Sequence, residues 1–173
     1  MPLISRRVQL GLVAAAYSAV LLISTVLVYW RYLQYIRHPD DVAASSGMWA
    51  GGDMMLAAFI ACLLLVPTFF LVIVLRKDEL AYTTYSKVLV GVALTAPLSI
   101  AALAIPGGSW LIGDICIFRI VATPFAVVAY VMSRIASRFR GPSRRIIYAL
   151  LIEVLTVAAA IVLLTVSSRF HRG

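Results

Sequence analysis

Long apolar segments alternate with short polar ones along the whole chain. Five of the apolar segments are long enough to cross a hydrocarbon core of about 30 Å as helices. They cover residues 8–29, 53–75, 85–105, 114–132 and 146–166. The pattern predicts an all-α membrane protein, a bundle of five transmembrane helices that forms a single integral membrane domain over residues 1–173.

Composition excludes packing in water. The chain is 63% hydrophobic and 13% charged, whereas a soluble domain is about half apolar and about a quarter charged. Lipid and neighbouring helices must therefore surround most side chains. The net charge of +8 does not indicate nucleic acid, because the basic residues gather at the ends of the apolar segments and form no basic stripe interleaved with exposed aromatic side chains.

The basic residues predict the orientation of the chain. If the N-terminus is cytoplasmic, the external side holds Arg31, Arg37, Arg169 and Arg172. The cytoplasmic side then holds Arg6, Arg7, Arg76, Lys77, Lys87, Arg134, Arg138, Arg140, Arg144 and Arg145. This positive-inside bias favours a cytoplasmic N-terminus and an external C-terminus. The basic loop between Arg134 and Arg145 is suited to anionic lipid headgroups.

Prolines and aromatic residues refine the predicted helices. Pro67, Pro97 and Pro124 fall inside helices and each predicts a kink, because proline has no backbone N–H. Residues 30–52 are expected to form one long external loop that begins with an aromatic cluster. The sequence His-Pro-Asp at 38–40 indicates that the first helix continues beyond the lipid and stops near Arg37.

The motif Gly-x-Trp-x-x-Gly-Asp occurs twice, at 47–53 and at 108–114. The 61-residue spacing defines tandem repeat units 47–105 and 108–166, each a helical hairpin in the same orientation. Duplication and local convergence explain the match equally well, since any helix that enters from the outer face benefits from Trp, Gly and a capping Asp. In either case Asp53 and Asp114 are predicted to cap their helices at the outer interface, and both are candidate binding residues.

Two charges lie inside the apolar segments, Arg119 and Glu153. A charge at the bilayer centre costs roughly 2.5–3.5 kcal/mol on insertion scales, so such residues usually face the protein interior or mark a functional path. Arg119 lies five residues beyond Asp114, about 7.5 Å into the layer. It can extend to the external headgroups, meet Asp114 or Asp53, or recognise an anionic group through its planar fork of donors.

Glu153 is the deep carboxyl, seven residues and roughly 10 Å from the cytoplasmic start of its segment. It must be protonated, paired or in contact with water, and Thr156 on the same helix face is a candidate hydrogen-bond partner. The backbones of Arg119 and Glu153 are expected to differ by about 12 Å in depth across a core of about 30 Å. We therefore expect no simple salt bridge between them.

Catalytic and cofactor motifs are not found in the sequence. No HExxH, CxxC, Walker loop or GxSxG occurs, and we expect no enzyme activity and no cofactor. Cys62 and Cys116 fall in apolar segments and do not predict a redox pair, while His38 and His171 lie in polar flanks. Arginine outnumbers lysine 13 to 2, which fits a bacterial inner membrane.

Two functions remain for a small multi-pass protein of the plasma membrane. The sequence favours a non-catalytic subunit or scaffold of a larger membrane complex, in contact with other membrane subunits or with further copies of itself. The alternative is a small transporter, or the membrane component of one, that handles protons, ions or anionic solutes at Glu153 and Arg119. The short loops and the absent catalytic motifs support the first interpretation, and the two intramembrane charges and kinked helices support the second.

Overall fold

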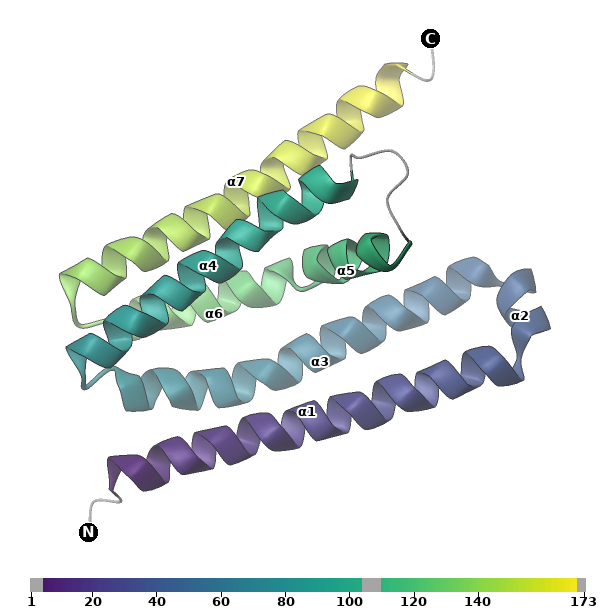
Figure 1. The fold of residues 1–173 in the computed structure, drawn as a ribbon. Coiled ribbons are helices and arrows are strands. Elements are labelled where there is room, and N and C mark those ends of the chain that lie inside the picture. The colour runs from purple at the N-terminus through teal and green to yellow at the C-terminus, as the bar shows by residue number, and fades with distance from the viewer. Residues whose placement is uncertain (1–4, 104–109, 171–173) are drawn as a thin grey trace. The chain divides into compact units, whose positions relative to one another are not determined.

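Seven helices follow one another along the chain in the computed structural model, which describes residues 5–103 and 110–170, with the side chains of 103–114 and 163–170 left out (Figure 1). The helices are α1 (Arg6–Arg37), α2 (Pro39–Ala44), α3 (Ser46–Leu75), α4 (Glu79–Leu103), α5 (Trp110–Val121), α6 (Thr123–Ala136) and α7 (Arg140–Phe170). No strand occurs among these residues. The predicted all-helical architecture is confirmed.

Four of the described helices, α1, α3, α4 and α7, are long and apolar enough to span a membrane. A fifth span is available if the bent pair Ile115–Val121 and Thr123–Ala136 counts as one, with an angle of 48° at the break. Helices suit such spans, because a segment that crosses lipid must satisfy its own backbone N–H and C=O groups. The kink predicted at Pro124 occurs as a helix break at Ala122, two residues earlier.

Several predicted boundaries shift. The first helix ends at Arg37, as expected, where the His38 N–H still donates to the Gln34 carbonyl and Pro39 opens α2. The long external loop predicted for residues 30–52 is wrong, because α1, α2 and the first turns of α3 occupy nearly all of it. Pro67 and Pro97 lie inside α3 and α4, as predicted.

The predicted caps at Asp53 and Asp114 are also wrong. Asp53 lies in the third turn of α3, which begins at Ser46, and Asp114 lies inside α5. The carboxylate cap occurs instead at Asp78, whose Oδ1 accepts a hydrogen bond from the Ala81 backbone N–H at 3.0 Å. This cap explains why α4 begins at Glu79 and not at residue 85. Gly108, His171 and Arg172 lie outside the described residues.

The chain divides into two compact units, residues 1–74 and 75–173. In the first unit α1 and α3 run antiparallel and are joined by α2 (Figure 1). A hydrogen bond of 2.8 Å joins the hydroxyls of Tyr17 and Thr68 across the two helices. Among the described residues of α1, Val13 alone is buried, so most of this helix presents apolar side chains outward.

The second unit contains α4 to α7. Helix α4 packs along α7 and also contacts α5, while α6 packs on α7. Its fully buried side chains include Tyr82, Tyr130, Ile146, Ser133 and Glu153. The interior of this unit is therefore partly polar.

A tyrosine–serine contact holds α4 to α6. The Tyr82 hydroxyl donates to the backbone carbonyl of Ser133, and the hydroxyls of Tyr85 and Ser133 lie 2.9 Å apart. The two tyrosine rings are 5.8 Å apart. Since the side chains of Tyr82 and Ser133 have no exposed surface, no water competes for these bonds.

We expect Tyr82→Phe to reduce the free energy of unfolding by about 1 kcal/mol, the usual net contribution of one hydrogen bond. Tyr148→Phe is the matched control, because Tyr148 is exposed on α7, and it should change little. Both can be measured by unfolding in detergent with increasing SDS. Equal stability of the two variants would contradict the role given to the Tyr82 hydroxyl.

Candidate functional site

Arg119 and Glu153 form a two-pronged ion pair inside the second unit. Arg119 lies near the C-terminal end of α5 and Glu153 near the middle of α7. Nη1 donates to Oε1 and Nη2 donates to Oε2, each at 2.8 Å. The Glu153 side chain is fully buried, and the Arg119 side chain is 15% exposed. This fork-to-fork geometry is the strongest form of carboxylate recognition by arginine.

The remaining donors of Arg119 are also used. Nε donates to the Thr95 hydroxyl at 2.7 Å, and Nη2 donates to the Val92 carbonyl at 3.2 Å. Nη1 has the Thr123 hydroxyl as a further acceptor at 3.4 Å. A guanidinium carries five N–H groups, and five acceptor contacts are present. One side chain thus joins groups from α4, α5, α6 and α7.

The expectation that Arg119 and Glu153 do not pair is wrong. It assumed that each helix starts at the membrane surface and runs straight across. However, α7 has 31 residues, about 46 Å at 1.5 Å per residue, which exceeds a core of about 30 Å. The depth of Glu153 therefore cannot be counted from Ile146. The expected bond to Thr156 is not found, because that hydroxyl donates to the Ile152 carbonyl.

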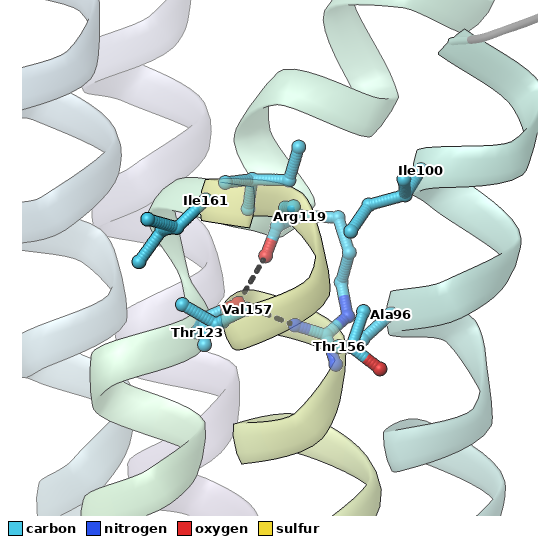
Figure 2. A pocket seen from close by; sticks show the side chains of 9 residues that line it. Ala96, Ile100, Arg119, Thr123, Thr156, Val157 and Ile161 are labelled. Carbon is cyan, nitrogen blue, oxygen red and sulfur yellow. Dashed lines mark hydrogen bonds between the residues drawn. The ribbon is translucent and has the colours of Figure 1, made fainter. Parts of the chain in front are cut away.

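A cavity of about 160 Å³ lies against the ion pair (Figure 2). Arg119, Thr123 and Thr156 border it together with apolar residues of α4, α5 and α7, and its surface is almost entirely apolar. Figure 2 shows the Arg119 side chain extending between α4 and α7, with its guanidinium near the Thr123 hydroxyl. The ion pair therefore borders a small, mostly apolar space within one helical unit.

Tyr130 adds a buried hydroxyl beside the pair. It lies seven residues after Thr123 on α6, is 1% exposed and is within electrostatic range of Glu153, Arg119 and Tyr85. Its hydroxyl has no hydrogen-bond partner among the residues that the structure describes. A buried hydroxyl without a hydrogen bond is unfavourable for folding, so its presence in a native structure requires an explanation. Tyr130 and the Tyr85–Ser133 contact extend the polar interior of the unit from Glu153 toward the α6–α7 connection.

Asp53 belongs to a second cluster, between α1 and α3 in the first unit. The Arg31 Nε donates to Asp53 Oδ1 at 2.6 Å, and the Tyr35 hydroxyl donates to Asp53 Oδ2. The Arg31 guanidinium lies over the rings of Tyr35 and Trp49, at 5.2 and 4.3 Å from their centroids. Arg31 Nη2 also donates to the Trp49 carbonyl at 2.8 Å. Asp53 is thus a partner of Arg31 and not of Arg119.

Sequence reasoning missed this cluster, although a signal was present. Arg31 and Tyr35 are four residues apart, and so are Trp49 and Asp53. In helices this spacing places both members of each pair on one face. The signal is lost when residues 30–52 are interpreted as a loop. The sequence also did not reveal the roles of Thr95, Thr123 and Tyr130. Their hydroxyls belong to the site only because the fold places Arg119 next to them.

The other candidate residues remain outside the site. Asp114 has a described backbone in α5, but its side chain is not among the described ones. Cys62 and Cys116 are free thiols. No group of three or more His, Cys, Asp or Glu that could hold a metal ion occurs within the part of the chain that the structure describes.

Comparisons with protein-family models, with curated proteins and with solved structures found no match.

We expect either Arg119→Met or Glu153→Leu alone to cost about 3–5 kcal/mol, because each leaves a buried charge without its partner. The double variant should be more stable than the sum of the single losses predicts, since it removes both charges. SDS titration in detergent micelles measures this, with exposed Arg144→Met as the control. Additive losses would contradict direct coupling.

We expect Gly52→Ala to weaken the Arg31 cluster. A Cβ at Gly52 would lie 2.9 Å from Arg31 Nη2, so the guanidinium must move away from the Trp49 carbonyl. Gly51→Ala is a matched control on the same helix, because its Cβ would meet nothing within 4 Å. Both changes gain helix propensity, so Gly52→Ala should be less stable than Gly51→Ala by about 1 kcal/mol, the value of one hydrogen bond. Thermal unfolding of the two proteins measures this difference.

Proposed function

We propose that the protein is a small membrane carrier, or the membrane component of one, that handles protons or anionic solutes at Arg119 and Glu153. The observation that carries this proposal is the buried ion pair beside a cavity at a helix break. A carboxylate that can exchange between a buried arginine and a proton is suited to coupling proton movement to solute movement. The pair lies on α5 and α7, next to the 48° bend.

The helix break supports a carrier because it provides a place where the bundle can change shape. Hinges are found at a few residues at the ends of helices. The short α5, with Arg119, is separated from α6 at Ala122. Interrupted helices near a buried charge are a frequent feature of transporter binding sites. Movement of α5 would carry the guanidinium with it and alter access to Glu153.

The proposal is non-catalytic. The described residues offer one buried carboxylate and one guanidinium at the site, whereas hydrolytic and transfer enzymes need a nucleophile, a metal or a paired acid and base. Neither nucleic acid nor a cofactor is part of the proposed function. The lipid bilayer is the principal surrounding, with anionic lipids at the basic 134–145 loop.

The proposed setting is the plasma membrane of a bacterium, with five spans, a cytoplasmic N-terminus and an external C-terminus. The distribution of arginine and lysine supports this orientation. The fifth span requires α5 and α6 to cross as one bent element. The hairpin repeat over 47–105 and 108–166 stays part of the proposal, supported by the matching motif at 47–53 and 108–114.

A second candidate is a subunit or scaffold of a larger membrane complex, or a homo-oligomer. The surface of α1 favours it, because Val13 is the one described residue of this helix that is buried, and many of its large apolar side chains are exposed. Lipid or protein must cover this apolar surface. The pairing of Arg119 with Glu153 within the chain makes a partner's charges unnecessary for either residue, which shifts preference toward the carrier.

We expect vesicles that contain the purified protein to take up protons when an inward proton gradient and a small monocarboxylate anion such as lactate are supplied. A pH-sensitive dye inside the vesicles measures the uptake. Glu153→Gln should lower the rate at least tenfold, because the amide cannot carry the proton. Glu79→Gln, the same change at an exposed carboxylate in the first turn of α4, should keep the rate.

Uptake equal to that of empty vesicles, or equal rates for the two variants, would contradict the carrier. Purification from native membranes in mild detergent, followed by mass spectrometry, distinguishes the second candidate. A partner in fixed stoichiometry that is retained by Glu153→Gln supports a subunit. A protein that purifies alone, or as a homodimer, and takes up protons supports the carrier.

A further inference from the structure

We propose that the cavity beside Arg119 binds a short-chain organic carboxylate, which replaces Glu153 on the guanidinium when Glu153 is protonated. The inference deepens the proposed function, on which it rests, by naming a ligand class and the event that admits it. It depends on three observations: a saturated guanidinium, a small apolar cavity against it, and a fully buried carboxylate as the internal competitor.

The guanidinium has no free donor while Glu153 is ionised. Glu153 takes two of the five N–H groups, and Thr95, Val92 and Thr123 lie in position for the others. An anion in the cavity would therefore meet a charge that is already neutralised. Two carboxylates at one arginine would repel each other. The site is closed to anions until Glu153 gives up its two bonds.

Protonation of Glu153 makes the two Nη donors of Arg119 available without a large rearrangement. A neutral carboxyl no longer balances the arginine charge, so an anion can take over the two donors. The proton stays on the Glu153 carboxyl and the ligand enters as its anion. One proton and one negative charge are thereby added together, and the net charge of the buried site does not change.

Few other groups compete for this proton. Among the described residues, the charged and titratable groups that face Glu153 are Arg119 on α5 and Tyr130 on α6, and Tyr85 on α4 lies within electrostatic range of Tyr130. The contacts from α4 at the pair itself are the Thr95 hydroxyl and the Val92 carbonyl, neither of which carries charge. Glu153 is thus the one carboxylate of the described site.

The cavity sets the size of the ligand. A cavity of roughly 150 Å³ has room for a molecule of about six carbon atoms, and the partly open cavity here has a volume of about 160 Å³. Its wall is almost entirely apolar and includes Ala96, Ile100, Ala160 and Ile161, with Arg119 at its edge. The aliphatic tail of a short carboxylate such as butyrate would lie in this cavity, with its carboxylate on the Arg119 guanidinium. Larger or multiply charged anions do not fit.

The test is butyrate binding to the full-length protein in detergent, measured by calorimetry at pH 8 and pH 6. Butyramide, which has the same shape but no charge, is the ligand control. We expect the wild type to bind butyrate up to tenfold more tightly for each pH unit lowered, because one proton accompanies each anion. Glu153→Gln should bind butyrate with one affinity at both pH values, at least as tight as the wild type at pH 6.

A cavity variant locates the binding without touching the ion pair. Ala160→Leu fills the cavity and should abolish butyrate binding, whereas Ala159→Leu makes the same change at the exposed neighbouring position of α7 and should leave it unchanged. Both variants retain Arg119 and Glu153, so their folding can be compared directly by thermal unfolding. Equal binding by the two would place the ligand elsewhere and overturn the proposal.

Two further results would overturn it. The first is no butyrate binding by the wild type at either pH, and the second is a pH dependence in Glu153→Gln that equals that of the wild type. Proton uptake by vesicles that depends on Glu153, together with the absence of butyrate binding, would reject this ligand and keep the carrier. Loss of both would reject the carrier as well.

Discussion

The second unit depends on the ion pair between Arg119 and Glu153. In lipid, apolar surface provides little drive for helices to associate, so polar contacts and close packing decide their arrangement. Each charge alone would be costly at membrane depth. The two charges neutralise each other, and Thr95, Val92 and Thr123 accept the remaining hydrogen bonds of the Arg119 guanidinium. Four helices are therefore placed by the requirements of a single side chain.

The break between α5 and α6 lies beside the ion pair and is explained by Pro124. Pro124 has no backbone N–H for the carbonyl four residues earlier, so the helix is weak at this point. The 48° bend directs α5 and α6 along different paths. Arg119 and Thr123, one on each side of Ala122, remain close enough for the Thr123 hydroxyl to reach the arginine. A proline that would destabilise a straight helix here helps to form the site.

The sequence predicted the existence of the helices much better than the contacts between them. Segment hydrophobicity identified every long helix, and His38-Pro39-Asp40 identified the end of α1. Starts were missed where local chemistry decides them, as at Asp78, whose carboxylate caps α4. The partner of Glu153 was missed because its depth in the membrane was counted from the start of the apolar segment. A helix of 31 residues is longer than the hydrocarbon core, so the point at which it enters the membrane is not known from the sequence. Composition and spacing reveal which charged residues would be unfavourable in lipid, but only the tertiary structure shows which side chains pair with them.

Two arginine–carboxylate contacts among the described residues, one in each unit, differ in geometry and in burial. The Arg31–Asp53 pair has side chains that are 22% and 27% exposed, and the aromatic rings of Tyr35 and Trp49 share the arginine. Such a partly solvated pair contributes modestly to stability. Glu153 has no exposed surface, so the protonation state of its carboxyl alters the whole environment of Arg119. The partly exposed Arg31–Asp53 pair joins α1 to α3, whereas the buried Arg119–Glu153 pair lies beside the cavity and carries the proposed function.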